Sequence, residues 1–104
     1  MDTLSRLERT IDARSGADPT TSYVASLNAR GLPVIARKLG EEATEAVVAA
    51  LTGSEEELVG EAADLLFHLT VLLRARGISL DHVMAELGRR EGTSGIEEKN
   101  ARES

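Results

Sequence analysis

The stretch that decides the fold runs from residue 32 to residue 76 and reads LPVIARKLGEEATEAVVAALTGSEEELVGEAADLLFHLTVLLRAR. Apolar residues recur through it at helical spacing, and Thr52-Gly53-Ser54 interrupts the pattern. We therefore predict one long helix from residue 32 to about residue 51 and a second from residue 54 to residue 76. Gly77 follows the second run and marks its end. Two long helices with a short connection favour antiparallel packing, and the rest of the chain must be arranged around them.

Shorter helices flank this pair. We expect them over residues 3–14, 23–30 and 80 to about 90. Thr3 is the expected cap of the first. No segment shows the alternation of a half-buried strand. The predicted fold is all-α, a bundle of four to five helices in a single domain over residues 1–104, with residues 91–104 as a mobile polar tail.

The composition limits the classes of protein to consider. At 104 residues, 41% of them apolar, the chain is expected to be one globular domain. It holds no cysteine, which excludes disulfides, thiolate zinc sites and a cysteine nucleophile. Its formal net charge of −6 argues against a general nucleic-acid binder, because such proteins normally present a basic face. The first residues lack the features of a signal peptide, and no apolar run is long enough to span a membrane, so we expect a cytoplasmic protein.

The second long helix is apolar on nearly every side. Its apolar residues include Leu65, Leu66, Phe67, Leu69, Val71, Leu72 and Leu73. A helix of this kind must be buried on several faces, and a chain of 104 residues offers limited cover of its own. A second subunit is the expected source of that cover, so we predict a homodimer that shares helices across its interface.

Two short acidic clusters lie within the long helices. The first has the pattern E-E-x-x-E (Glu41, Glu42 and Glu45), and the second has the pattern E-x-x-D (Glu61 and Asp64). At about 100° per residue, Glu42 lies about 60° and Glu61 about 40° from the centre of the apolar stripe on its own helix. Each helix offers two acids at i,i+3 on one side of its stripe, and Glu41 points toward the rim. Antiparallel packing would bring four carboxylates together, those of Glu42, Glu45, Glu61 and Asp64.

Carboxylates beside an apolar core are costly unless something compensates their charge. A hard divalent cation such as Mg²⁺, which prefers oxygen ligands, is the candidate. The alternative is an ordinary solvated helix face. That reading suits the acids of residues 55–57 at a helix N-terminus, but not Glu42 and Glu61, which lie close to the stripe.

Two residues near the clusters can each be interpreted in two ways. Lys38 lies between Glu42 and Glu45 in helical angle, where it could contact a phosphate oxygen or form an ion pair with Glu42. His68 lies one turn beyond Asp64 and could support a metal ligand or be a packed, hydrogen-bonded core histidine. The spacing does not match the Glu-x-x-His motif of di-iron bundles, which weighs against a redox site.

The pattern E-E-x-x-E followed by E-x-x-D on two helices resembles the all-α (MazG-like) nucleotide pyrophosphohydrolase superfamily. Four segments are similar, more narrowly, to the phosphoribosyl-ATP pyrophosphohydrolase family of histidine biosynthesis. They are SYVASL from Ser22, RKLGEEATE from Arg37, EAADLLFHL from Glu61, and the tail from Arg89 to Lys99 with TSGIEEK at its end. The resemblance extends from Ser22 to Arg102.

The resemblance implies hydrolysis of 1-(5-phosphoribosyl)-ATP to 1-(5-phosphoribosyl)-AMP and pyrophosphate, the second step of histidine biosynthesis. It implies that Mg²⁺ is held by Glu42, Glu45, Glu61 and Asp64. Glu41 is expected to position the attacking water or to bind a second metal, with Lys38 beside it. The implied substrate contacts are Ser22, Tyr23, Lys38, Arg89, Arg90, Ser94, Gly95 and Lys99. The cyclohydrolase that acts next, fused to this domain in some relatives, would be a separate partner.

Several of these assignments have alternatives. Tyr23 can be a loop anchor instead of a substrate contact, and the segment from Arg89 to Lys99 can be a disordered tail or a phosphate clamp that orders on the ligand. The rival enzyme is a house-cleaning nucleoside triphosphate pyrophosphohydrolase that uses the same metal site on dUTP, dCTP or a damaged nucleotide. A rival of another class is a non-catalytic helical dimerisation module whose acids only keep it in solution.

Overall fold

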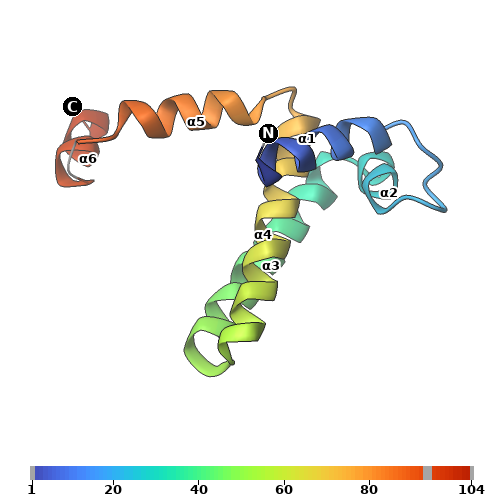
Figure 1. Cartoon of the computed structure of the whole chain (residues 1–104), viewed down its shortest axis with the longest axis horizontal. Helices are drawn as coiled ribbons and strands as arrows, with labels where there is room; N and C mark the ends of the chain where they lie inside the picture. The colour runs from blue at the N-terminus through green and yellow to red at the C-terminus, as the bar shows by residue number, and fades with distance from the viewer. Residues whose placement is uncertain (1, 93–94, 104) are drawn as a thin grey trace.

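The computed structural model describes residues 2–92 and 95–103, and every regular element within them is an α-helix (Figure 1). In chain order the helices are α1 (Thr3–Arg14), α2 (Tyr23–Arg30), α3 (Leu32–Thr52), α4 (Glu55–Ala75), α5 (Leu80–Arg89) and α6 (Gly95–Glu103). The all-α prediction is confirmed, and the first five helices match their expected bounds to within one residue. The sequence pattern does not predict α6, because the tail is polar and carries glycine. The mobility expected of residues 91–104 stays a prediction.

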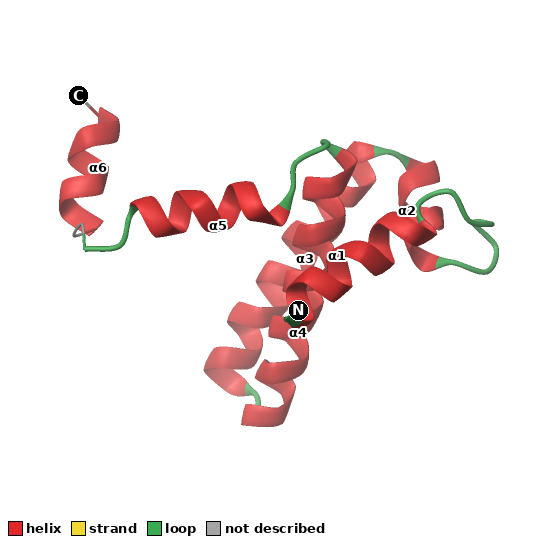
Figure 2. Cartoon of the chain, turned by 45° about the horizontal axis from the view of Figure 1, so that its top comes forward, coloured by secondary structure: helices red, strands yellow, loops and turns green. Residues whose placement is uncertain are grey.

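The centre of the fold is the antiparallel pair of α3 and α4, which lie side by side in Figures 1 and 2. Ser54 caps α4 by accepting a hydrogen bond from the main-chain N–H of Glu57 at 3.1 Å. The turn before it depends on Gly53. A Cβ at that position would lie 3.0 Å from the Ala49 carbonyl oxygen and 2.6 Å from a Glu57 carboxylate oxygen. This tight turn sets which residues of the two helices face each other.

Helices α1 and α2 cover one end of this pair and close the core. The buried cluster consists of Ile11 from α1, Val24 and Leu27 from α2, Ile35 from α3 and Val71 from α4. Leu7 of α1 and Phe67 and Leu72 of α4 pack against this cluster. The core therefore occupies one end of the α3–α4 pair, where α1 and α2 pack on it.

The start of α1 differs in one detail from the sequence prediction. Asp2, and not Thr3, caps the helix: its carboxylate accepts a hydrogen bond from the main-chain N–H of Ser5 at 2.8 Å. Asp2 has the extended backbone of a cap residue, whereas Thr3 is already the first helical residue. A carboxylate at this position also interacts favourably with the positive end of the helix dipole.

The end of α4 turns the chain toward α5. Gly77 has a φ of +73°, a left-handed conformation that favours glycine, and the Ile78 N–H donates to the Leu73 carbonyl oxygen at 2.9 Å. From this turn α5 leads away from the α3–α4 pair in both views (Figures 1 and 2). Helices α5 and α6 therefore lie outside the four-helix core of their own chain.

This arrangement is more extended than a compact domain of the same length. The radius of gyration is 15.8 Å, against about 13 Å expected for a compact chain of about this size. Large apolar side chains remain exposed on α3, α4 and α5, namely Leu32, Val47, Val48, Leu51, Val59, Leu66, Met84 and Leu87. The predicted homodimer would cover such a surface, and it stays a prediction at this point.

Within residues 2–92 and 95–103, none of the helices combines the length and the apolar character needed to cross a membrane. The cytoplasmic location expected from the sequence stays a prediction.

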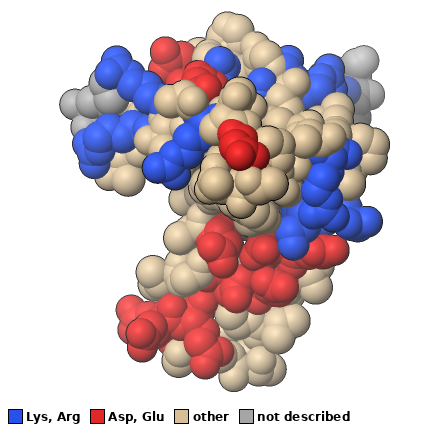
Figure 3. Space-filling model, turned by 90° about the vertical axis from the view of Figure 1, so that its right-hand side faces the viewer, with Lys and Arg blue, Asp and Glu red and all other residues tan. Residues whose placement is uncertain are grey.

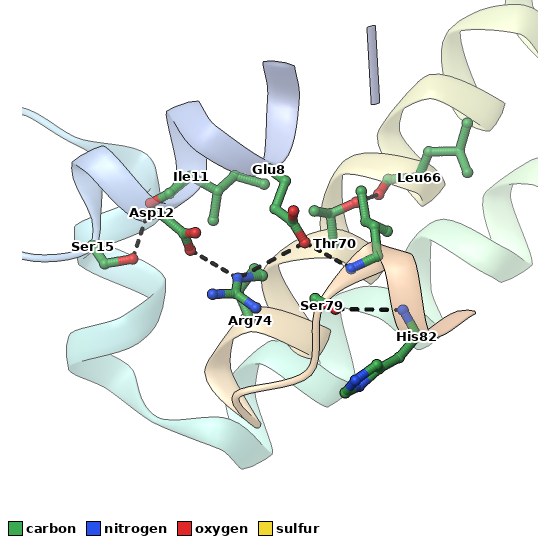
Figure 4. Close-up of polar contacts among 10 residues, drawn as sticks. Glu8, Ile11, Asp12, Ser15, Leu66, Thr70, Arg74, Ser79 and His82 are labelled. Carbon is green, nitrogen blue, oxygen red and sulfur yellow. Dashed lines mark hydrogen bonds and ion pairs between the residues drawn. The ribbon is translucent and has the colours of Figure 1, made fainter. Parts of the chain in front are cut away.

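Glu8 joins α1 to the start of α5 (Figure 4). Its carboxylate accepts a hydrogen bond from the main-chain N–H of Leu80 at 2.7 Å and lies 4.0 Å from Nε of Arg74. Arg74 also donates to the Asp12 carboxylate at 2.8 Å. Because Leu80 is buried, its N–H has little access to water as a replacement partner. The contact therefore helps to set the direction in which α5 leaves the core.

Replacing Glu8 tests this junction. Glu8→Ala leaves the Leu80 N–H without its acceptor, so we expect the free energy of unfolding to fall by about 1–3 kcal/mol. Arg9→Ala, a change at the exposed neighbouring position, is the matched control and should stay within about 0.5 kcal/mol. Urea denaturation followed by circular dichroism measures both, and equal effects of the two changes would contradict the role given to Glu8.

Candidate active site

Three carboxylates meet between α3 and α4. One oxygen from each of Glu42, Glu45 and Glu61 lies within 4.8 Å of the other two. Glu42 and Glu45 are one turn apart on α3, and Glu61 comes from α4. In Figure 3 acidic side chains gather over the lower part of the molecule, and basic side chains lie above them. The antiparallel pair thus brings members of both sequence clusters into one place.

Two of these carboxylates have an oxygen that is shielded from solvent and lacks a partner. Oε2 of Glu42 and Oε2 of Glu61 are buried, and neither has a hydrogen-bond partner among the described residues. A buried polar atom that lacks a hydrogen-bond partner destabilises the fold, and more so when its group is charged. Such atoms point to a compensating ligand that binds at the cluster.

Loss of hydration raises the pKa of both Glu42 and Glu61. For Glu42, burial is the largest cause of the raised pKa, and the charge of Glu45 comes next. For Glu61, burial again comes first, and the neighbouring Glu45 carboxyl raises the pKa further. The charge of Asp64 also raises the pKa of both residues. A bound cation would act in the opposite direction, because it favours the ionised carboxylates.

Asp64, the predicted fourth ligand, is exposed at the edge of the cluster. With Glu45 and Glu61 it lines an open groove of about 470 Å³ between α3 and α4. Thr44 and Glu57 line the same groove, and the sequence analysis did not include them in the site. The groove gives the acidic cluster access to solvent and so to a ligand.

The donor set suits a hard divalent cation. It contains carboxylate oxygens, which Mg²⁺ prefers over nitrogen and sulfur donors. Two of these oxygens lack a partner, and three carboxylates already lie close enough to share one ion. The side chains that are present therefore fit an Mg²⁺ site, and their role as ligands stays a prediction.

Glu41 lies on the outer side of α3, where its carboxylate stands between two basic groups. It is 3.7 Å from Nε of Arg37 and 3.6 Å from Nζ of Lys38. The sequence analysis suggested an ion pair between Lys38 and Glu42, and this suggestion is wrong, because Lys38 pairs with Glu41 instead. Lys38 pairs with Glu41 because both side chains reach the outer surface, whereas an oxygen of Glu42 turns inward.

His68 is a packed, hydrogen-bonded core histidine, one of the two interpretations made from the sequence. It is only 5% exposed. Its Nδ1 lies 2.8 Å from the main-chain carbonyl oxygen of Asp64, and its Nε2 lies 2.8 Å from the hydroxyl of Tyr23. Tyr23 is thereby anchored to α4, yet it remains 49% exposed. Ser22 caps α2 by accepting from the Ala25 N–H at 3.2 Å.

The structure does not bring the basic residues of α5 to the acidic cluster of their own chain. Arg89 and Arg90 lie at the end of α5, which leads away from the cluster in Figures 1 and 2. Both donate to Glu86, and these hydrogen bonds lower the pKa of Glu86 to about 2. Of the remaining predicted contacts, Gly95 and Lys99 belong to α6, and Ser94 lies outside the described residues.

One contact of the site has no signal in the sequence. The Tyr23–His68 hydrogen bond joins residues that are 45 positions apart and lie on different helices. The only hint is that a histidine inside an apolar run must find a polar partner once it is buried. Which residue becomes the partner of His68 depends on how α2 packs on α4, and local sequence patterns do not determine that packing.

An all-α fold whose two central helices gather unpartnered carboxylates is the arrangement expected of the MazG-like nucleotide pyrophosphohydrolases. The model of the family described as phosphoribosyl-ATP pyrophosphohydrolase matches residues 4–91. The chain belongs to the phosphoribosyl-ATP pyrophosphohydrolase family, a family of hydrolases.

Close relatives extend over nearly the whole chain. A protein of Erythrobacter litoralis is 71% identical over 102 residues, which cover 98% of this chain and 98% of the relative. Proteins of Novosphingobium aromaticivorans and Rhizorhabdus wittichii are 63% and 62% identical, and the matches cover 95% and 96% of this chain and 92% and 94% of the relatives. Each of the three is named phosphoribosyl-ATP pyrophosphatase.

The raised pKa values of Glu42 and Glu61 predict how stability depends on pH in the absence of metal. Above the ordinary carboxyl value of 4.5, the folded chain holds more protons at these residues than the unfolded chain does. Stability therefore falls as pH rises through the raised pKa values. At pH 8 without divalent metal, Glu61→Gln should melt at a higher temperature than the original chain, and this advantage should shrink toward about pH 5.

Thermal melting followed by circular dichroism measures this effect, with and without Mg²⁺. Glu56→Gln is the control, since Glu56 lies in the exposed first turn of α4, where an acid is favourable and its removal should give no gain. Mg²⁺ should raise the melting temperature of the original chain more than that of Glu61→Gln. A Glu61→Gln chain that melts below the original at pH 8 without metal would contradict the interpretation of the cluster.

Proposed function

We propose that this chain hydrolyses 1-(5-phosphoribosyl)-ATP to 1-(5-phosphoribosyl)-AMP and pyrophosphate, the second step of histidine biosynthesis, with Mg²⁺ bound at the acidic cluster. The observation that carries the proposal is the pair of buried, unpartnered oxygens on Glu42 and Glu61. A cation bound to these oxygens would neutralise the carboxylates. Without it, the acidic surface would repel the phosphates of the substrate. Membership of the family and the printed names of the relatives support the same substrate.

Four residues would hold the ion: Glu42, Glu45, Glu61 and Asp64. When bound, Mg²⁺ would neutralise phosphate charge and help to generate or orient the attacking water. The groove of about 470 Å³ beside the cluster offers room for the phosphate chain. Its lining by Glu45, Glu61 and Asp64 would place the scissile bond next to the ion-binding carboxylates.

Glu41 and Lys38 have roles on the outer side of the same helix turn. Arg37 and Lys38 hold the Glu41 carboxylate at 3.7 and 3.6 Å, so its position is constrained from two sides. A carboxylate held in this way can accept a hydrogen bond from the attacking water and so orient it. Lys38 can turn from Glu41 to a phosphate oxygen, since its ammonium sits on a flexible stem.

We further propose that the working form is a homodimer. Its support is the extended chain, with a radius of gyration of 15.8 Å, and the exposed apolar side chains on α3, α4 and α5. A second copy would bury these surfaces, and it would also supply neighbours for α5, which leaves the core of its own chain. The cyclohydrolase of the next step would be a separate protein.

The proposed activity is tested with purified protein, Mg²⁺ and phosphoribosyl-ATP, in parallel with dUTP, dCTP and the other dNTPs. We expect pyrophosphate release from phosphoribosyl-ATP and none on removal of Mg²⁺ by a chelator. Release from dNTPs alone would support the house-cleaning enzyme instead. No release from any of these nucleotides would support the non-catalytic dimerisation module.

Glu61→Gln should lower kcat by more than about 100-fold, because changes to residues that only support metal ligands already cost about 10–100-fold. Glu56→Gln should remain active.

The dimer is tested by light scattering after size-exclusion chromatography. The original chain should elute with twice the 11.1 kDa mass of one chain. Leu87→Glu places a charge on the exposed apolar side of α5 and should shift the protein to the monomer. Ala85→Glu, about 160° around α5 from Leu87, should remain a dimer. A monomeric original chain would contradict the proposal.

A further inference from the structure

The groove beside the acidic cluster extends beyond it toward the turn between α3 and α4. Helix α3 runs toward this turn and α4 runs away from it, so the residues after Glu45 on α3 face the residues before Glu61 on α4. From Glu45 to Thr52 this part of the groove spans about 10 Å of helix. We call it the turn half of the groove, and five residues line it: Val48, Ala49, Thr52, Glu57 and Gly60.

The middle of the turn half is apolar and open. Ala49 is 7% exposed and lies at its floor, and Val48 borders it with a side chain that is 53% exposed. Gly60 lines the opposite wall, on α4. A Cβ at Gly60 would meet no described atom beyond its own stretch of helix within 4 Å, so packing within the chain does not require glycine there. Glycine is unfavourable in the middle of a helix, and its effect at this position is to keep the groove open.

Phosphate groups find no positive partner in the turn half. The sequence has no lysine or arginine between Lys38 and Arg74. Acids begin α4 at the turn, and acidic side chains gather over this end of the molecule in Figure 3. The phosphate chain of a nucleotide is therefore restricted to the acidic cluster and its cation, and another part of the ligand must fill the apolar part of the groove.

The far end of the turn half offers hydrogen-bond acceptors. The Thr52 hydroxyl donates to the Val48 carbonyl oxygen at 2.9 Å, so its oxygen has only lone pairs left for a ligand. The Glu57 carboxylate is an acceptor as well. It lies at the turn, since a Cβ at Gly53 would be 2.6 Å from one of its oxygens. A ligand group that reaches this end must therefore present a hydrogen-bond donor.

We propose that the turn half of the groove binds the nucleobase of the substrate, with the base over Ala49 and beside Gly60, and with an N–H donor of the base directed at Glu57. The base is the part of a nucleotide that has flat, apolar faces and carries N–H donors at its edge. Gly60 then determines specificity, because a larger side chain at this position would occupy the space of the base. The open side of the groove leaves room for a substituent on the base. This inference rests on the proposed function, which places the phosphates at the cluster.

The base site is tested by calorimetry with Mg²⁺ and two probes. One is α,β-methylene-ATP, which cannot be hydrolysed between its α and β phosphates, and the other is tripolyphosphate, which has no base. Gly60→Leu should weaken the binding of α,β-methylene-ATP by about 10-fold or more and leave that of tripolyphosphate unchanged. An equal loss for both probes would overturn the proposal, because the groove would then hold phosphate. An unchanged affinity for α,β-methylene-ATP would overturn it too.

Two further variants separate a filled groove from a damaged fold. Gly60→Ala should melt no lower than the original chain, because alanine favours a helix and its Cβ has free space. It should still weaken the binding of α,β-methylene-ATP, by a smaller factor than Gly60→Leu does. Ala85→Leu, which places a leucine at an exposed position of α5, should bind both probes as the original chain does.

The orientation of the base is tested with the inosine counterpart of the same analogue, which has a carbonyl oxygen in place of the amino group of adenine. Glu57 would repel this oxygen, so the original chain should bind the inosine analogue about 10-fold or more weakly than α,β-methylene-ATP. Glu57→Gln, whose amide can donate, should narrow the difference, whereas Glu56→Gln should not. Equal binding of the two analogues by the original chain would overturn the orientation.

The failure of the proposed function would look different. A chain that does not hydrolyse phosphoribosyl-ATP, but binds α,β-methylene-ATP and loses it through Gly60→Leu, would contradict the proposed substrate and support the base site. A chain that hydrolyses phosphoribosyl-ATP with the same KM before and after Gly60→Leu would support the proposed function and overturn the base site.

Discussion

The rest of the structure depends on the contact between α3 and α4, which holds acidic side chains of both helices close together. Repulsion among Glu42, Glu45 and Glu61 opposes the contact of α3 with α4, and two of their oxygens are buried without a partner. The pair stays together because apolar burial along the rest of the interface outweighs this repulsion. Glu42 and Glu61 therefore reduce the stability of the α3–α4 pair when no cation is bound.

The sequence predicts the helices well because their ends are marked locally. Ser54 caps the helix that follows it, and Gly77 stops the one that precedes it. The acidic cluster is also predictable, because acids at i,i+3 on one side of two antiparallel helices must meet if the turn is short. Both inferences use only neighbours in sequence and the regular geometry of a helix. The misassigned cap at Thr3 shows the limit of such rules, since the choice between adjacent polar residues depends on one hydrogen bond.

Contacts between distant helices could not be predicted in the same way. Glu8 accepts from Leu80, 72 positions later, and Tyr23 bonds to His68, 45 positions later. Each contact depends on the angle at which one helix packs on another, and no residue pattern states that angle. The direction of α5 is of this kind, and it decides that Arg89 and Arg90 lie far from the cluster of their own chain. The residue types suitable for a phosphate clamp were visible in the sequence, but their location was not.

The two arginines also show that composition alone does not make an anion site. Their hydrogen bonds to Glu86 lower the pKa of that carboxyl to about 2, so Glu86 stays ionised and competes with any phosphate for the same donors. A phosphate must displace Glu86 or share the guanidinium groups with it. Displacement is feasible because all three side chains are at least partly exposed, and an exposed ion pair contributes little to stability. A phosphate carries more charge than one carboxylate and can accept from both guanidinium groups at once, so it can compete with Glu86 for these donors. Within one chain α5 leads away from the acidic cluster, so a clamp on a nucleotide bound at the cluster would have to come from the α5 of the proposed second copy.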